Sequence, residues 1–336
     1  MAVAAAILGA SGFVGAELLR LCELHPELEP ARLFGDSQAG LPLSEVHPQL
    51  ALAYPGLGIE RFEAGALEGV ELVFAALPHG ESQRLAPLIL ELGIPFVDLG
   101  ADFRLDDAED YARWYHEPHQ APELLGAFVY GIPEINRERI RRAIAVAAAG
   151  CYPTAAILAL GPLVQAGAID PATIIVDAAS GVSGAGKALK EATHFNAVAE
   201  NMSAYGLLNH RHTAEMDMCL SGPVLFTPHL APMNRGILAT CYASATSDAE
   251  PLEILAQAYA DEPFVQVSEA PPSTKWTLGS NAVHLTARRD PRTGRVVAIA
   301  ALDNLVKGAA GQMIQCANLM LGMEETAGLP VTGVYP

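Results

Sequence analysis

A glycine-spaced loop close to the N-terminus constrains the fold of this chain more than any other feature. Gly9, Gly12 and Gly15 follow a short apolar run at residues 2–8 and precede a segment, 17–24, in which leucine recurs at helical spacing. A strand, a tight glycine turn and a helix in this order let a pyrophosphate approach the backbone at the start of the helix. A plain strand-to-helix turn also uses glycine, but this context favours dinucleotide binding.

Strand and helix patterns continue to alternate after this loop. Strand candidates lie at 31–34, 70–77 and 94–99, and a helix candidate lies at 82–92. This alternation predicts a parallel, doubly wound sheet of the Rossmann type.

The later part of the chain has a different pattern. Several strand candidates alternate apolar and polar residues, as in an antiparallel sheet with one covered face; they lie at 173–178, 222–227, 235–245, 283–288 and 295–302. We therefore expect an α/β protein with two domains. The first spans 1–149 and is completed by a C-terminal helix at 305–336. The second, at 150–304, is an α+β domain with a mixed or antiparallel sheet.

Composition excludes several functional classes. The 336 residues are 51% hydrophobic and carry a formal charge of −18, which is unfavourable for binding nucleic acid or an anionic membrane. No apolar run reaches the roughly 18 residues of a transmembrane helix. The five cysteines are scattered and form no C-x-x-C pair. We expect no nucleic-acid or membrane partner and a reducing, cytoplasmic location.

The segment Gly150-Cys151-Tyr152-Pro153 points to covalent chemistry. It lies between small apolar residues at 143–149 and an apolar, helical stretch at 155–164. The thiol is therefore expected on a tight turn at a helix N-terminus, where backbone N–H groups and the helix dipole favour the thiolate. Core cysteines behave as small hydrophobes and need no turn. We interpret Cys151 as a nucleophile that can hold an acyl group as a thioester.

His210-Arg211-His212 supplies candidates for proton transfer, because histidine titrates near neutral pH. Surface histidines are the alternative interpretation. A metal site would need a third ligand at suitable spacing, which the sequence lacks. We expect no metal.

Arg104 follows a buried strand, at the edge of the sheet where doubly wound folds bind ligands. It could clamp a carboxylate or phosphate, or form a surface ion pair with Asp106 or Asp107. The residues leave this choice open.

The local sequence does not decide between NAD and NADP as the cofactor. An acidic residue about 20 positions beyond the glycine loop usually binds the ribose 2′-hydroxyl of NAD, and Asp36 lies roughly there. Ser37 beside it could instead accept the 2′-phosphate of NADP.

Two further loops are polar. Residues 180–187 resemble half of a phosphate loop, but Ala188 stands where a magnesium ligand is needed, which excludes a P-loop NTPase. Asn304 offers a hydrogen-bonding amide, although helix capping by Asp303 or Asn304 would explain both residues.

Taken together, these segments resemble the N-acetyl-γ-glutamyl-phosphate reductase family, relatives of aspartate-semialdehyde dehydrogenase. The resembling segments cover nearly the whole chain in order and lie at 9–15, 77–80, 100–105, 150–155, 180–187, 210–216, 279–284 and 303–312. The resemblance implies NADPH-dependent reduction of N-acetyl-γ-glutamyl phosphate to N-acetylglutamate 5-semialdehyde and phosphate, an oxidoreductase step of arginine biosynthesis. It also implies a homodimer or homotetramer, with 150–304 as the catalytic and dimerisation domain.

The resemblance implies a role for each matching residue. Cys151 would be the nucleophile, and His210 or His212 the acid/base, with His212 preferred. Substrate-binding residues would be Arg104, Arg211 and Glu215. Cofactor-binding residues would be Gly9, Ser11, Gly12, Phe13, Val14, Ser37, Pro78, Ser183, Gly184 and Asn304.

Three other functions compete with this one. Aspartate-semialdehyde dehydrogenase uses the same cysteine chemistry, but the G-C-Y-P-T and H-R-H segments disfavour this function. A relative acting on a carrier-bound substrate is disfavoured by the charge of −18. A non-catalytic dinucleotide sensor would need neither Cys151 nor the histidines.

Overall fold

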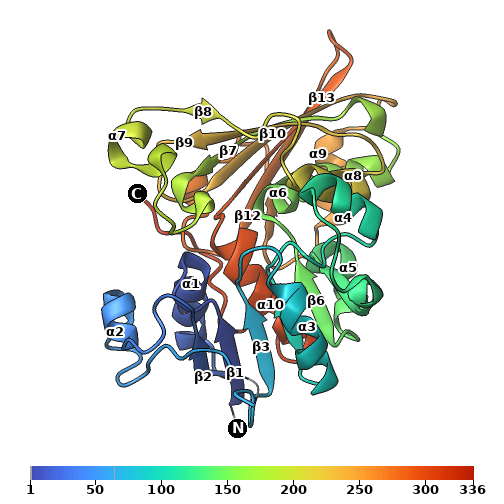
Figure 1. The fold of residues 1–336 in the computed structure, drawn as a ribbon. Coiled ribbons are helices and arrows are strands. Elements are labelled where there is room, and N and C mark those ends of the chain that lie inside the picture. Colours follow the sequence, from blue (N-terminus) through green and yellow to red (C-terminus); the bar gives the residue numbers. More distant parts are fainter. Residues whose placement is uncertain (1, 64) are drawn as a thin grey trace. The chain divides into compact units, whose positions relative to one another are not determined.

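The computed structural model describes residues 2–63 and 65–336, which separate into two units (Figure 1). Unit 1 comprises Met1–Ala149 and Ala309–Leu329, and unit 2 comprises Gly150–Gly308 and Pro330–Pro336. The functional domain limits stated above stay a prediction.

Unit 1 is built on a six-stranded sheet in the order β2-β1-β3-β4-β6-β5. Its strands are β1 (Val3–Leu8), β2 (Leu28–Phe34), β3 (Leu72–Ala75), β4 (Phe96–Asp98), β5 (Phe128–Gly131) and β6 (Ala145–Ala148). Every pairing is parallel, which confirms the predicted doubly wound sheet. All residues of β3, β4 and β6 are buried, as expected for parallel strands covered on both faces.

Helices cover both faces of this sheet. On one face, Ala86 and Ile89 of α3 (Ser82–Glu91) share a core with Val73, Ala75 and Phe96. The other face carries α10, which contacts β4, β5 and β6 as well as α1 and α5. The helices of this unit are α1 (Phe13–Glu23), α2 (Leu43–Val46), α3, α4 (Ala108–Tyr115), α5 (Pro133–Ile140) and α10 (Gly311–Met320).

The C-terminal helix is shorter than expected. The prediction of a helix over 305–336 is wrong beyond α10, which ends at Met320. Gly322 adopts φ of 70°, a left-handed conformation that ends a helix. A π-helix, Val306–Ala310, precedes α10.

Unit 2 contains a seven-stranded mixed sheet in the order β11-β12-β13-β10-β7-β9-β8. Its strands are β7 (Ile175–Gly181), β8 (Ser203–Ala204), β9 (Leu225–Ala231), β10 (Ile237–Ser244), β11 (Val265–Val267), β12 (Val283–Asp290) and β13 (Arg295–Leu302). The pairs β7–β9 and β11–β12 are parallel and the others antiparallel, which confirms the expected mixed sheet.

One face of this sheet is packed against helices. The helix α6 (Cys151–Gln165) contacts β10 and β13, and α9 (Pro251–Ala258) contacts β12. Burial therefore alternates along β10: Ala239 and Cys241 are buried, whereas Leu238 and Tyr242 are partly exposed.

The parallel pairing of β7 with β9 requires a long crossover. Residues 182–224 provide it and include α7 (Phe195–Val198), β8 and α8 (His212–Leu220). The strand expected at 222–227 begins later, at Leu225, because Asp217 accepts a hydrogen bond from the Val224 N–H (2.7 Å) and holds the preceding turn. The crossover thereby carries both candidate histidines.

Candidate active site

Cys151 is the first residue of α6, and Gly150 is its extended N-cap, with φ of −65° and ψ of 153°. The first turn of a helix leaves backbone N–H groups without helical partners, and these favour a thiolate. Cys151 is partly exposed, while the residues that follow it in the helix are buried. The helix is therefore a rigid support with its thiol at the accessible end.

Two other cysteines have a contrasting environment. Cys22 and Cys241 are buried, and this burial raises the pKa of each thiol to about 12. A thiol of this kind is inert near neutral pH because the thiolate is the reactive form.

Gly308 approaches the candidate nucleophile closely. A Cβ atom at position 308 would lie 2.7 Å from the Cys151 Cβ, which leaves no room for a side chain. Gly308 belongs to the π-helix, a feature that is frequent at functional sites. This glycine lies in the family-like segment 303–312, but nothing in the sequence indicates that it packs against Cys151.

Glu215 links the thiol turn to α8. One carboxylate oxygen, Oε2, accepts a hydrogen bond from the Gly150 N–H at 2.9 Å, and the other, Oε1, lies 3.9 Å from Nε2 of His212. The Glu215 side chain is almost completely buried, with 1% exposure. The role of Glu215 in substrate binding stays a prediction; in the structure its carboxylate contacts the peptide before Cys151 and lies beside the His212 ring.

An aromatic cluster surrounds His210. Its ring centroid lies 5.7 Å from that of Tyr152, 5.5 Å from Tyr205, 5.3 Å from Phe226 and 4.8 Å from His212. Tyr205 donates a hydrogen bond to the Tyr152 hydroxyl, which donates to the carbonyl of His229. Neither tyrosine is among the predicted site residues, because an aromatic residue in the sequence does not by itself indicate a place in an active site.

The two histidines differ in what their rings can do. Nδ1 of His210 accepts a hydrogen bond from the His212 backbone N–H at 3.2 Å. Burial, and secondarily the charge of Arg211, lowers the pKa of His210 to about 4. His210 is thus a neutral acceptor that supports the start of α8. His212 begins that helix, with its side chain 20% exposed and beside a buried carboxylate. Arg211, between them, is exposed.

Ser183, Gly184 and Asn304 lie together in unit 2. The Asn304 amide donates to Ser183 Oγ at 2.9 Å and accepts from the Gly236 N–H at 2.7 Å. A Cβ at Gly184 would lie 2.9 Å from Ser180 Oγ. Asn304 therefore ties the 180–187 loop to a neighbouring strand end. Asp303 caps the helical segment that follows, because its carboxylate accepts a hydrogen bond from the Leu305 N–H at 2.8 Å.

The glycine loop of unit 1 fits a dinucleotide. Gly9 has φ of 84°, and a Cβ there would meet the Ala76 carbonyl oxygen; a Cβ at Gly15 would lie 2.5 Å from the Gly9 oxygen. At Gly12, by contrast, a Cβ would meet only the Gly9 oxygen at 3.5 Å, so one side of the loop is open. Gly12 is the N-cap of α1, whose first N–H groups belong to Phe13 and Val14. This is the arrangement that binds a pyrophosphate.

Other predicted residues of unit 1 lie at strand ends. Ser11 is in the glycine loop, Ser37 follows β2, and Pro78 follows β3. His47, which sequence analysis missed, supports the loop through a 3.0 Å hydrogen bond between Nε2 and the Ala10 carbonyl.

Arg104 is buried and donates to the Leu99 carbonyl oxygen at 2.7 Å. Arg104 also acts on Asp98, a completely buried carboxyl group. Burial raises the pKa of Asp98 to about 7, and the Arg104 charge opposes this rise.

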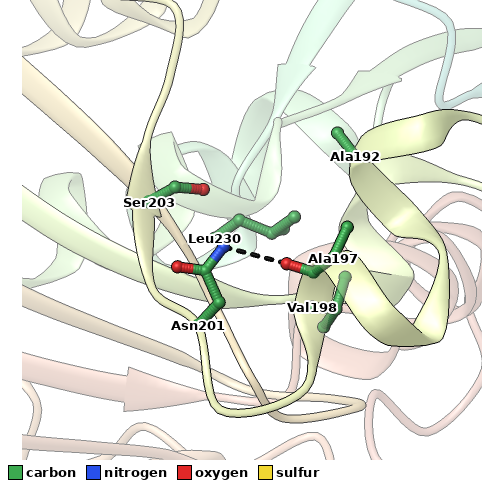
Figure 2. Close-up of a pocket in the computed structure, with 6 residues that line it drawn as sticks. All are labelled: Ala192, Ala197, Val198, Asn201, Ser203 and Leu230. Carbon is green, nitrogen blue, oxygen red and sulfur yellow. Dashed lines mark hydrogen bonds between the residues drawn. The ribbon is translucent and has the colours of Figure 1, made fainter.

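A small pocket lies away from these residues. It lies between the α7 segment and β9 and has a volume of about 110 Å³. Figure 2 shows the residues that line it. Its lining residues are Ala192, Ala197, Val198, Asn201, Ser203 and Leu230. Asn201 donates to the Ala197 carbonyl at 2.9 Å, and the lining includes neither Cys151 nor a candidate histidine, so this pocket is not the candidate active site. Among the described residues, no group of three His, Cys, Asp or Glu side chains could hold a metal ion. No helix in the same part of the chain combines the length and apolarity needed to cross a membrane.

Comparisons with known proteins agree with this geometry. The model of the semialdehyde dehydrogenase NAD-binding domain matches residues 4–143, and that of the semialdehyde dehydrogenase dimerisation domain matches 151–304. Among solved structures, aspartate semialdehyde dehydrogenase II from Vibrio cholerae has a TM-score of 0.72 at 19% identity, covering 96% of this chain and 99% of that chain. The enzyme from Candida albicans, solved with NADP, has a TM-score of 0.68 at 16% identity, with coverages of 96% and 99%. These likenesses show the fold.

Closer relatives show the family. N-acetyl-γ-glutamyl-phosphate reductase from Symbiobacterium thermophilum is 47% identical, and that from Pelotomaculum thermopropionicum 45% identical, each over the full length of both chains. The resemblance noted in the sequence is thereby confirmed. The chain belongs to the N-acetyl-γ-glutamyl-phosphate reductase family of semialdehyde dehydrogenases.

Proposed function

We propose that this chain reduces N-acetyl-γ-glutamyl phosphate to N-acetylglutamate 5-semialdehyde and inorganic phosphate with NADPH, as a step of arginine biosynthesis. The family membership supports the reaction and the cofactor. The observation that carries the proposal is the Glu215 carboxylate, which joins the peptide before Cys151 to the helix of His212.

In this reaction Cys151, His212 and Glu215 have separate roles. Cys151 Sγ attacks the acyl carbon, the bond to the phosphate oxygen breaks, and inorganic phosphate leaves behind a thioester on Cys151. When bound, NADPH would supply the hydride that reduces this thioester. His212 donates a proton to the resulting thiohemiacetal oxygen and takes it back as the carbon–sulfur bond breaks, which releases the aldehyde and restores the thiolate. Glu215 stabilises the imidazolium during this exchange.

Binding roles follow from position. Gly9, Ser11, Gly12, Phe13 and Val14 hold the pyrophosphate, and Ser37 and Pro78 extend the cofactor site along the strand ends. Ser183, Gly184 and Asn304 form the nicotinamide-side loop. Arg104 and Arg211 are the candidate partners of the substrate's anionic groups.

The reaction is tested in its reverse direction. Purified protein is mixed with NADP⁺, inorganic phosphate and N-acetylglutamate 5-semialdehyde, and NADPH formation is followed by absorbance. Phosphate-dependent turnover that disappears in Cys151→Ala, while this variant still binds NADPH, supports the proposal. Turnover of aspartate semialdehyde instead would assign the sister activity. Cofactor binding without turnover of either aldehyde would indicate a carrier-bound substrate or a sensor.

The chain forms a homodimer or homotetramer in the cytoplasm. The match of 151–304 to a dimerisation domain supports assembly, and five cysteines without a disulfide suit a reducing compartment. The sheet face opposite α6 offers partly exposed Leu238, Tyr242 and Val297, of which Tyr242 and Val297 are cross-strand partners. We expect Val297→Glu to sediment as a smaller species than wild type. Leu52→Glu, at a leucine 98% exposed in unit 1, is the matched control.

A further inference from the structure

A charge conflict exists at the end of β2. Asp36 follows this strand, at the position where a carboxylate normally binds the ribose 2′-hydroxyl of NAD. The same carboxylate would repel the 2′-phosphate of NADP. A chain that uses NADPH therefore needs a positive charge at this place.

The structure brings such a charge to Asp36 from a distant part of the sequence. Residues 34 and 60 form a parallel bridge, and the Gly35 N–H donates to the Glu60 carbonyl at 3.0 Å. Arg61, the next residue, consequently lies beside Asp36, and its Nη1 is 3.2 Å from the Asp36 Oδ1. In the sequence the two residues are too far apart to suggest this pair.

The same strand end touches the glycine loop. The N–H groups of Gly9 and Ala10 both donate to the Phe34 carbonyl at 2.9 Å. A Cβ at Gly35 would lie 3.3 Å from Ser11 Oγ. A dinucleotide with its pyrophosphate on this loop would thus extend its adenosine ribose toward Asp36 and Ser37.

Arg61 is available for an anionic ligand, unlike its neighbour Arg32. Arg32 is engaged by both carboxylate oxygens of Glu60, at 3.1 and 2.6 Å. Among the described residues, Arg61 contacts Asp36 through a single nitrogen, and the side chains of the pair are 67% and 91% exposed.

We propose that Arg61, together with Ser37, binds the 2′-phosphate and so determines the selectivity of this chain for NADPH over NADH. The Arg61 guanidinium neutralises Asp36 and offers its remaining donors to the phosphate, a geometry that arginine suits well. This inference rests on the proposed function only in requiring a nicotinamide dinucleotide at the glycine loop.

The test measures binding rather than turnover. Dissociation constants for NADPH and NADH are determined by nicotinamide fluorescence for wild type, Arg61→Ala, Arg61→Lys and the matched control Arg32→Ala. We expect Arg61→Ala to weaken NADPH binding about 10-fold or more, as for the loss of a charge-assisted hydrogen bond, and to change NADH binding less than about 2-fold. Arg61→Lys should recover part of the loss, and Arg32→Ala should change neither constant by more than about 2-fold.

A double variant tests the role of the carboxylate. In Arg61→Ala/Asp36→Asn the repulsion from Asp36 is absent, so NADPH binding should improve relative to Arg61→Ala alone. The proposal is overturned if Arg61→Ala binds NADPH as wild type does, or loses NADPH and NADH equally. A protein that keeps this selectivity but lacks phosphate-dependent turnover would reject the proposed reaction and leave the Arg61 assignment standing.

Discussion

The buried carboxylate of Glu215 accepts a hydrogen bond from the Gly150 backbone N–H at 2.9 Å. Gly150 precedes the candidate nucleophile, and the same carboxylate lies 3.9 Å from the His212 ring. A single side chain therefore positions both the thiol turn and the candidate acid/base. Exposure of only 1% keeps water from competing for these contacts.

Replacing Glu215 should separate its two contacts. Glu215→Gln keeps an oxygen for the Gly150 N–H but removes the charge beside His212, so we expect kcat to fall about 10-fold and the pH–rate profile to move to lower pH. Glu215→Ala removes both contacts and should cost more. Steady-state kinetics across pH give the answer, with Asp217→Asn on the same helix as the control. A Glu215→Gln enzyme with an unchanged profile would contradict the positioning role.

Replacing His212 should lower kcat more than replacing His210. His212→Asn is expected to lose roughly 10²–10⁴-fold in kcat, the range for general acid–base catalysis. His210→Asn retains an acceptor for the His212 N–H and should lose about 10-fold or less, because a ring with a pKa of about 4 is uncharged near neutral pH. Equal losses in the two variants would show that His210 shares the proton transfer.

Gly308→Ala should damage the nucleophile selectively. The added methyl group would lie 2.7 Å from the Cys151 Cβ, so the thiol or the π-helix must move. We expect a loss in kcat of about 10-fold or more, because small misplacements of a reacting group are costly. Gly161→Ala, whose methyl group would meet only Ile157 at 3.9 Å, is the control. Cysteine alkylation rates and kcat would both remain at wild-type values if Cys151 tolerates the crowding.

The buried carboxyl group of Asp98 should make stability depend on pH. Its pKa of about 7, against an ordinary 3.8, means that the folded state holds a proton over a pH range in which the unfolded state has released it. This contribution to stability is full below about 3.8 and is lost as pH rises through 7.

We therefore expect wild type to lose about 2 kcal/mol of unfolding free energy between about pH 5 and 8 relative to Asp98→Asn, whose amide cannot ionise. Urea unfolding of both proteins across this range measures the difference. The lowered histidine pKa values, of His25, His210 and His284, act equally in both proteins and cancel. Parallel stability curves would show that Asp98 titrates normally.

Local patterns were sufficient for much of this protein. The glycine spacing at 9–15 predicted the strand, turn and helix that the structure has there. Glycine is needed in this turn because a Cβ at Gly9 would meet the Ala76 carbonyl. Cys151 at a helix start and the mixed second sheet also follow from short-range sequence. The helix expected over 305–336 failed beyond Met320, because a single left-handed glycine at 322 ends it.

Contacts between distant residues could not be derived from the sequence. Glu215 meets Gly150, and Arg61 meets Asp36, only because helix packing and strand pairing bring their backbones together. The choice between His210 and His212 likewise depends on burial and on an aromatic cluster drawn from several elements. Local propensity is encoded in neighbouring residues, whereas desolvation, charge pairing and side-chain orientation arise when the sheets assemble. Local sequence was therefore enough to predict the fold class and the reactive residue types, whereas packing and strand pairing set which of those residues act on one another.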